Sequence, residues 1–211
     1  MPIDRELLAR PAVELAPWLL GGVVTSNVGG HHVAVRLTEV EAYQGTLDAA
    51  SHAYRGLTAR NAVMYGPPGH LYVYFSYGMH WCANLVCGPD GRAAAVLLRA
   101  GDVVDGLDAA WSRRPAARFA RELARGPARL ASCLGISGAL NGVDVCAADS
   151  ALQLTSLPAG RVASIRSGPR VGISAAAEQP WRFWIDGDPT VSAFRPGGRP
   201  CAKGARQTDP S

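Results

Sequence analysis

Two glutamates at the end of an apolar segment are the residues best placed for acid–base chemistry. Residues 32–43 alternate like a β-strand, so Glu39, Glu41 and Tyr43 are predicted to share one face with apolar residues. Those apolar residues are Val33, Val35 and Leu37. A carboxylate that loses its water is prepared to act as a general base or to stabilise positive charge. Glu41 is the first candidate because Tyr43 lies beside it, Glu39 competes for the role, and a surface glutamate at a strand end is the alternative.

Aromatic residues gather around a predicted hairpin. Residues 71–77 and 79–87 are predicted to be strands, which places Tyr77 and Gly78 at the tip between them. Three tyrosines and a tryptophan fall within ten residues here: Tyr72, Tyr74, Tyr77 and Trp81. Aromatic rings stack on nucleobases, and a ring at a hairpin tip can insert into a duplex. A set of core aromatics with one exposed tyrosine is the alternative.

A run of arginines follows. Residues 105–125 are predicted to be helical, with a break or fresh start at Pro115, and their arginines recur at spacings of four, three and four. These residues are Arg114, Arg118, Arg121 and Arg125. Such a stripe could neutralise phosphates. A short helix is predicted to begin at residues 126–127 and to end at Gly135, and its N-terminus could bind a further phosphate. A solvated helix face is the alternative.

Composition bounds the size of the protein and the charge of its partner. The chain has 211 residues, of which 48% are hydrophobic, and is predicted to form one domain over residues 1–195. Residues 196–211 are polar and rich in proline and glycine, which predicts a disordered tail. Residues 1–110 hold 7 Lys/Arg against 10 Asp/Glu (net −3), whereas residues 111–211 hold 14 against 7 (net +7). A polyanionic partner for the C-terminal half is plausible.

Several classes of protein lose support. No apolar run approaches the length of a membrane span and the N-terminus lacks a signal-peptide pattern, so a cytoplasmic protein without a membrane partner is expected. Five cysteines form no C-x-x-C pair, and the signatures of P-loop enzymes, α/β-hydrolases, zincins and zinc deaminases are missing. Strand alternation puts His80 and Cys82 on the face opposite Cys87, so no metal site is predicted.

Periodicity predicts a single α+β domain with an antiparallel sheet. The first 20 residues are expected to be helical, with Asp4 as the cap of a first turn, Pro11 at the first position of a second and Gly21-Gly22 as the end. Strands are predicted at 32–43, 71–77, 79–87 and 92–99, the last three forming a meander, and further strands at 151–157, 161–165 and 182–186. Residues 45–69 show no sustained periodicity, which indicates a long ordered loop of the kind that often carries function.

An ordered series of short segments resembles one enzyme family. The segments are 38–43 (TEVEAY), 50–52 (ASH), 58–61 (TARN), 64–69 (MYGPPG), 72–74 (YVY), 77–79 (YGM), Asn84 and 97–99 (LLR). They resemble the alkyladenine (3-methyladenine) DNA glycosylase family, over about residues 19–194, with weaker matches at 126–130 and 182–184. The chain lacks the N-terminal extension of some animal members, as expected of a bacterial member. Ala59 stands where many relatives have proline, and residues 138–160 align poorly.

The resemblance implies a fold and a set of roles. The fold would be a curved, partly open antiparallel β-barrel-like sheet, similar to the C-terminal domain of formyltransferases, with helices around it. Glu41 would activate water for attack on the sugar C1′, and Arg99 would position that water or the neighbouring phosphate. The flipped base would be held by Tyr43, His52, Tyr74, Asn84 and Leu97, and Tyr77 would fill the vacated stack. Arg114, Arg118, Arg121, Arg125 and Arg129 are then the candidate contacts to the DNA backbone.

The implied reaction is hydrolysis of the N-glycosidic bond of alkylated or deaminated purines in double-stranded DNA. Lys203 is the only lysine and lies outside the motifs, so a monofunctional enzyme without metal or organic cofactor is expected, acting as a monomer. The alternative from another class is a non-catalytic module that binds damaged or distorted nucleic acid with the same aromatic hairpin and arginines. A hydrolase of free nucleosides is a third possibility.

Overall fold

A computed structural model describes residues 3–155 and 164–198. Its α-helices are α1 (Arg5–Leu8), α2 (Ala12–Leu19), α3 (Leu107–Arg113) and α4 (Pro127–Cys133). Its strands are β1 (Val23–Ser26), β2 (Val33–Tyr43), β3 (Leu71–Ser76), β4 (His80–Val86), β5 (Ala95–Asp105), β6 (Leu152–Thr155), β7 (Ile165–Gly168) and β8 (Arg182–Ile185). In the described part of the chain these strands form one open antiparallel sheet, which confirms the α+β prediction.

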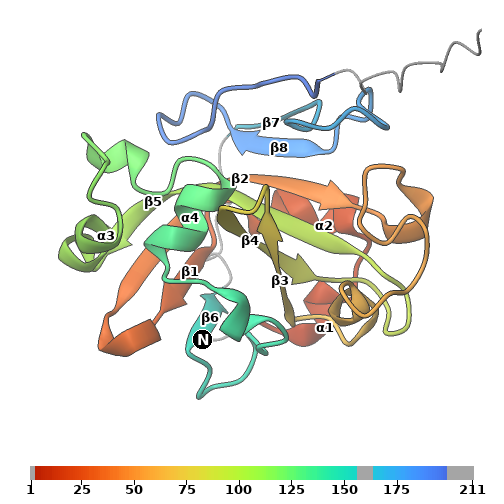
Figure 1. Cartoon of the computed structure of the whole chain (residues 1–211), viewed down its shortest axis with the longest axis horizontal. Helices are drawn as coiled ribbons and strands as arrows, with labels where there is room; N and C mark the ends of the chain where they lie inside the picture. Colours follow the sequence, from red (N-terminus) through yellow and green to blue (C-terminus); the bar gives the residue numbers. More distant parts are fainter. Residues whose placement is uncertain (1–2, 156–163, 199–211) are drawn as a thin grey trace, which may run out of the picture.

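Strand β2 organises the sheet. Six strands follow the order β3-β4-β5-β2-β1-β6, so the predicted meander of β3, β4 and β5 is confirmed. One edge of β2 pairs with β5, whereas the other edge pairs with β1 near its start and with β8 near its end. Figure 1 shows β7 and β8 lying beside β2 at the top of the view, away from β1 and β6. The C-terminal segment is thereby brought to the end of β2 that carries the two glutamates.

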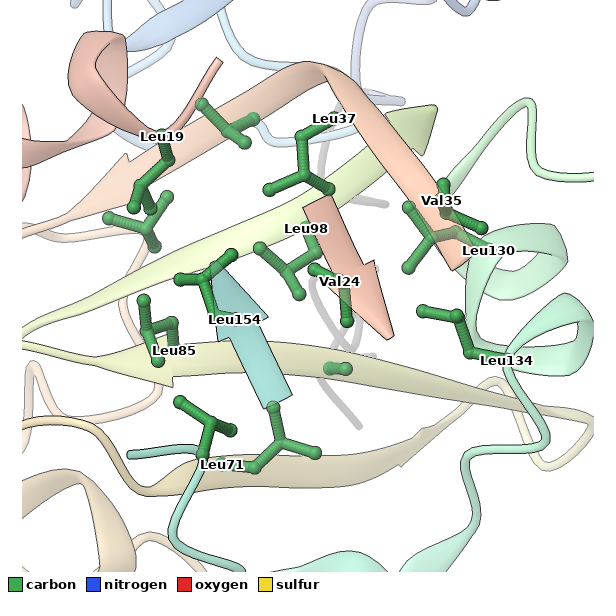
Figure 2. Packing of buried hydrophobic residues seen from close by; sticks show 14 of the residues in the cluster. Leu19, Val24, Val35, Leu37, Leu71, Leu85, Leu98, Leu130, Leu134 and Leu154 are labelled. Atoms are coloured by element: carbon green, nitrogen blue, oxygen red, sulfur yellow. The ribbon is translucent and has the colours of Figure 1, made fainter. Parts of the chain in front are cut away.

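A β-bulge in β2 overturns the predicted alternation. The register of β2 against β5 shifts between Leu37 and Glu39 and again before Val40, and Figure 2 shows the strand bending sharply near Leu37. An extra residue reverses which side chains face the core. The core cluster therefore contains Val33, Val35 and Leu37 before the bulge but Val40 and Ala42 after it. Glu39 and Glu41 consequently do not share the core face, contrary to the expectation from the sequence.

The main core lies inside the bent sheet. Figure 2 shows Val24 and Leu154, from β1 and β6, together with Leu85 and Leu71 from β4 and β3 and with Leu130 from α4. All of these side chains are at most 3% exposed. Burial of leucine or valine side chains contributes about 1.5–3 kcal/mol each, so this cluster holds the sheet in its curved form. No helix among the described residues is long and apolar enough to cross a membrane.

Predicted and observed elements differ in three places. The N-terminal helix is split into α1 and α2, and Asp4 caps α1 by accepting a hydrogen bond from the backbone N–H of Glu6. The predicted strand 92–99 extends to Asp105, so α3 starts later and ends at Arg113. The prediction of a helix over 105–125 is wrong beyond Arg113, because the chain makes turns and a single 3-10 turn at Ala120–Glu122.

Two observed strands differ further from the prediction: β1 was not predicted, and β7 begins at Ile165, where the predicted strand 161–165 ends. The other predicted elements are present within the described residues. The loop 45–69 contains only the 3-10 turns Gly45–Leu47 and Ala62–Tyr65, and the short helix opened by Pro127 ends before Gly135. The predicted strands 151–157 and 182–186 correspond to β6 and β8. Residues 156–163, which include most of the predicted strand 161–165, lie outside the described residues, as does the predicted tail from residue 199 onward.

Candidate active site

One cavity of about 580 Å³ collects most of the side chains predicted to act on a base. It lies on the face of the sheet opposite the main core. Its lining includes these predicted residues: Tyr43, His52, Tyr74, Tyr77, Asn84, Leu97 and Arg99. Side chains that are separated by up to 56 positions in the sequence, from Tyr43 to Arg99, thus meet at one site.

Strand register explains this convergence. Glu41 on β2 is opposite Leu97 on β5, which is opposite Asn84 on β4, which is opposite Tyr72 on β3. Residues directly opposite each other in an antiparallel sheet project to the same face. Tyr43, Arg99 and Tyr74 lie two positions from members of this row, so they project to that face as well. The amide nitrogen of Asn84 donates to the carbonyl of Tyr72 at 3.1 Å, which fixes its side chain.

The long loop forms the wall that carries His52. Asn61 is buried and holds the loop together, since its amide nitrogen donates to the carbonyls of His52 and Gly56, each at 3.0 Å. Nδ1 of His52 lies 3.0 Å from the hydroxyl of Tyr72, and its ring meets the ring of Tyr74 edge-on at 4.5 Å between centroids. Burial, together with the charge of Arg60, lowers the pKa of His52. The imidazole is therefore neutral at neutral pH.

Glu41 is fully buried against the cavity lining. Its Oε1 accepts a hydrogen bond from the backbone N–H of Val171 at 2.7 Å and lies 3.3 Å from Nη1 of Arg99. Its Oε2 accepts from the hydroxyl of Tyr43 at 2.9 Å. Burial raises the pKa of Glu41, and Arg99, Val171 and Tyr43 offset that effect only in part. The surface-glutamate alternative is thus wrong, because Glu41 is 0% exposed and touches three residues that line the cavity.

Glu39 occupies a different environment. Its Oε1 accepts hydrogen bonds from Nε of Arg99 at 2.8 Å, Nε of Arg182 at 2.7 Å and the hydroxyl of Ser192 at 2.9 Å. Its Oε2 accepts from the backbone N–H of Ser192 at 2.7 Å. Burial alone would raise the pKa of Glu39, but the charges of Arg99 and Arg182 and the hydrogen bond from Ser192 hold it below its usual range. Glu39 is therefore an ionised structural anchor for Arg99, whereas Glu41 is the carboxylate next to the cavity.

The aromatic hairpin is formed as predicted. β3 and β4 pair from Leu71–Leu85 to Ser76–His80, and residues 77–79 close the turn. Tyr77 has φ = 51° and Gly78 has φ = 65°, a left-handed pair that suits a tight hairpin but is unusual for a tyrosine. The side chain of Tyr77 is 87% exposed at the cavity mouth. The tip of the hairpin thus presents an exposed aromatic ring beside the cavity.

The arginines do not form the predicted stripe. Since residues 114–125 are not one helix, Arg114, Arg118, Arg121 and Arg125 do not share a helix face, and none of them lines the cavity. Nε of Arg125 donates to the carbonyl of Val191 at 2.9 Å, which ties it to the C-terminal segment. Arg121 is exposed and lies over the ring of Phe119, 4.4 Å from its centroid, and Arg118 and Arg129 are exposed.

Several residues of the cavity were given no role in the site by the sequence analysis, although Arg60, Met64 and Pro127 lie in segments that carried the resemblance. Arg60, Met64 and Pro127 line the cavity, as do residues 171–173. The last segment reaches the site only because β8 pairs with β2 and because Val171 donates to Glu41 across 130 positions. No three His, Cys, Asp or Glu side chains in the described ranges lie together in a way that could hold a metal ion.

Comparison with known proteins bears directly on this geometry. Residues 6–189 match the family model described as methylpurine-DNA glycosylase. A protein of Streptomyces avermitilis is 54% identical over 199 residues, which cover 92% of each chain, and one of Frankia casuarinae is 50% identical over 200 residues, covering 90% of this chain and 92% of the other. A protein of Mycobacterium tuberculosis is 48% identical over 208 residues, covering 96% and 99%. All three carry the name "Putative 3-methyladenine DNA glycosylase".

These matches confirm the resemblance found in the short motifs. The family model covers residues 6–189, which include the segment around Val171 and Arg182 that completes the site. With an aromatic cavity, a buried carboxylate and an exposed hairpin tyrosine in one place, sequence and geometry agree. The chain belongs to the methylpurine-DNA glycosylase family.

Proposed function

We propose that this protein is a monofunctional DNA glycosylase that removes alkylated or deaminated purines from double-stranded DNA and leaves an intact abasic site. The observation that carries the proposal is the position of Glu41, a fully buried carboxylate that touches Tyr43, Arg99 and Val171, all of which line an aromatic cavity. The substrate class proposed is 3-methyladenine, 7-methylguanine, hypoxanthine and ethenoadenine, and the active species is a monomer.

The chemistry follows from the charge of the transition state. Cleavage of the N-glycosidic bond builds positive charge on the sugar, and a nearby carboxylate both stabilises that charge and takes a proton from the attacking water. In the proposed mechanism the water oxygen bonds to C1′, the purine leaves with the electrons of the C1′–N bond, and Glu41 receives the proton. Arg99 orients the carboxylate and the water, because its guanidinium lines the cavity and contacts Glu41 at 3.3 Å.

The cavity suits an extruded purine. The proposed seat for the base is formed by Tyr43, Tyr74 and neutral His52, with Asn84 and Leu97 at its floor. Electron-rich rings attract a cationic purine, such as one alkylated at N3 or N7, by about 0.5–2 kcal/mol. Flipping costs a few kcal/mol and least for damaged or mispaired bases, so extrusion itself adds selectivity. Asn84 is proposed to disfavour the exocyclic amine of guanine.

We assign the contacts to the DNA backbone to exposed arginines. Arg118, Arg121 and Arg129 are exposed and remain candidates for phosphate contact. Arg114 and Arg125 are partly buried, and Arg125 donates to Val191, so these two are weaker candidates.

The first test is release of free base from duplexes that carry 7-methylguanine, hypoxanthine or ethenoadenine. Under single-turnover conditions we expect release from at least one lesion, with an intact strand on alkali-free gels and no protein–DNA adduct after borohydride. Water as the nucleophile requires this result, because a lyase would pass through a Schiff base that borohydride traps. A trapped adduct or a nicked strand would show that an amine of the protein attacks C1′.

The pH dependence of release should report the ionisation of Glu41. The rate must fall as pH decreases through the pKa of Glu41, because only the ionised form accepts a proton, and the raised pKa places this fall above the usual range of a glutamate. The substrate of choice is 7-methylguanine, whose fixed positive charge removes any need to protonate the leaving base. A rate that stays level down to pH 4.5, the ordinary pKa of a glutamate, would contradict the raised pKa.

Replacement of Tyr77 should affect base flipping more than chemistry. Tyr77→Gly is the preferred variant, since φ = 51° costs glycine nothing and the fold is preserved. Loss of one stacking ring, worth about 1–3 kcal/mol, should lower the single-turnover rate on duplex DNA roughly tenfold or more. Tyr77→Phe is the matched control and should retain the wild-type rate. Equal rates for the glycine variant and the wild type would remove Tyr77 from the flipping step.

A further inference from the structure

A buried ion pair joins two walls of the cavity and is not used by the mechanism above. Nη1 and Nη2 of Arg170 donate to Oδ2 and Oδ1 of Asp48 at 2.5 and 2.8 Å, and both side chains are 0% exposed. Nη1 of Arg170 also donates to the carbonyl of Ala42 at 3.0 Å. A charge pair so completely removed from water is costly unless its geometry is tightly held. The pair therefore fixes the relative positions of the segments that carry it.

Each partner lies immediately next to a functional part of the site. Asp48 organises the loop that leads to His52, because its Oδ1 accepts from the backbone N–H of Ala50 at 3.0 Å and its Oδ2 from that of Gln44 at 3.3 Å. Arg170 precedes Val171, whose N–H is the donor to Glu41. The two segments approach β2 at Ala42, between Glu41 and Tyr43.

The guanidinium of Arg170 also supports an aromatic ring of the cavity. It lies 4.6 Å from the ring centroid of Tyr43 and 5.1 Å from that of Trp181. Tyr43 lines the cavity and Arg170 does not, so the arginine braces the ring from outside the base site. Nε of Arg170 is buried and has no hydrogen-bond partner among the described residues, and the packed rings provide its surroundings.

We propose that Arg170 and Asp48 are positioning residues for the glycosylase reaction: their ion pair sets the N–H of Val171 on the carboxylate of Glu41 and the ring of Tyr43 in the base site. The assignment rests on the proposed function. Neither residue touches the substrate in this scheme. Both act through groups that do, and loss of the pair should loosen the cavity wall of residues 171–173 and the loop that carries His52.

The pair should have a distinctive effect on Glu41. The groups that face this carboxylate are Arg99 from β5, Glu39 and Tyr43 from β2, Tyr74 from β3 and the N–H of Val171. The N–H of Val171 lowers the pKa of Glu41, against the effect of burial. If the Val171 segment moves away, Glu41 loses this hydrogen bond while its other neighbours remain. The acidic fall of the rate should then move to higher pH.

The test uses a double substitution that leaves no unpaired buried charge. Arg170→Met with Asp48→Asn removes the ion pair, while the amide oxygen of the new side chain still accepts from the N–H of Ala50. The strongly destabilising change is removal of one partner, which leaves a buried charge unpaired, and the double substitution avoids it, so the protein should fold. The matched control, Arg5→Met with Asp144→Asn, removes the 2.6 Å ion pair between Arg5 and Asp144, neither of which lines the cavity.

The measurement is single-turnover release of 7-methylguanine from duplex DNA against pH, with lesion binding and melting temperature measured in parallel. The double variant should bind the lesion and release base about 10²-fold more slowly at the pH optimum, since misplacement of a reacting group by about 1 Å costs that much. The pH below which its release rate decreases should be higher than in the wild type. The control should match the wild type in both the rate and the pH profile. Arg170→Lys keeps the positive charge but cannot make the paired hydrogen bonds of the guanidinium to Asp48. Its release rate should lie between those of the double variant and the wild type.

The outcomes separate the possibilities. A folded double variant with the wild-type rate and the wild-type pH profile would overturn the assignment. A slower rate with an unshifted profile would also overturn it, because the hydrogen bond from Val171 to Glu41 would then be independent of the ion pair. If the double variant does not fold, the same criteria apply to Arg170→Lys. Absence of release by the wild type itself would overturn the proposed function, a result that the variants cannot mimic.

Discussion

Glu41→Gln is expected to lower single-turnover release of base by about 10³-fold or more while lesion binding stays within a few-fold of the wild type. A general base contributes about 10²–10⁴-fold, and loss of the carboxylate charge also removes stabilisation of the cationic sugar. Glutamine has the same shape and can still accept the hydrogen bond from Val171, so the cavity should keep its form. The measurement is release of hypoxanthine and 7-methylguanine in the presence of excess enzyme.

The effect on stability distinguishes lost chemistry from lost structure. Because the pKa of Glu41 is raised in the folded protein, the ionised side chain opposes folding at neutral pH. A neutral glutamine removes that cost, so the melting temperature of the variant should equal or exceed that of the wild type. Glu14→Gln, an exposed position on α2, is the matched control and should change neither rate nor melting temperature by a measurable amount.

Two results would contradict the assignment of Glu41. Undiminished release by the glutamine variant would mean that another group activates water, and Glu39 would return as the candidate. Tight lesion binding by both proteins with no release by either would favour the non-catalytic binding module, which has no need of an acid beside its pocket.

The sequence predicted the strands of the site better than the faces they present. Periodicity located β2, the hairpin and β5, because each alternates or is bounded by turn residues. It could not locate the bulge after Leu37, since no glycine or proline marks it and one extra residue reverses every later side chain. The two glutamates were therefore expected on the core face, whereas the structure places them opposite it. The family resemblance, and not alternation, predicted the residues that the structure brings together around the cavity.

The contacts of the site between residues far apart in the sequence could not be predicted either. Ser192 contacts Glu39 across 153 positions, and Arg170 contacts Asp48 across 122. Neither contact leaves a local pattern, because it depends on β8 pairing with β2. The predicted helix over 105–125 is an error of another kind: its arginine intervals of three and four fit a helix, but the chain makes turns beyond Arg113. Local spacing predicts structure reliably only when an apolar face supports it.

Glu39→Gln should be the most destabilising of the substitutions considered. The carboxylate is 0% exposed and accepts hydrogen bonds from Arg99, Arg182 and Ser192. Its loss leaves the buried guanidinium of Arg182 without its anion and that of Arg99 with Glu41 alone. Removal of one partner from a buried ionic network costs about 3–5 kcal/mol. Ser192→Ala is the matched control, because it removes one hydroxyl donor but keeps the backbone N–H, and it should cost about 1 kcal/mol. Chemical denaturation at neutral pH measures both values.

The difference in unfolding free energy between the wild type and Glu39→Gln should depend on pH in a way that reveals whether the charge of Glu39 causes it. Arg99 and Arg182 hold the pKa of Glu39 below that of a glutamate in the unfolded chain, so its stabilisation is complete above the unfolded pKa and disappears as pH falls through the folded one. The unfolding free energies of wild type and Glu39→Gln should therefore differ most at neutral pH and converge in acid. A difference that stays constant as pH falls would mean that shape, not charge, anchors Arg99. Arg99 also contacts Glu41. Convergence would therefore establish that the charge of Glu39 holds Arg99 in place beside Glu41.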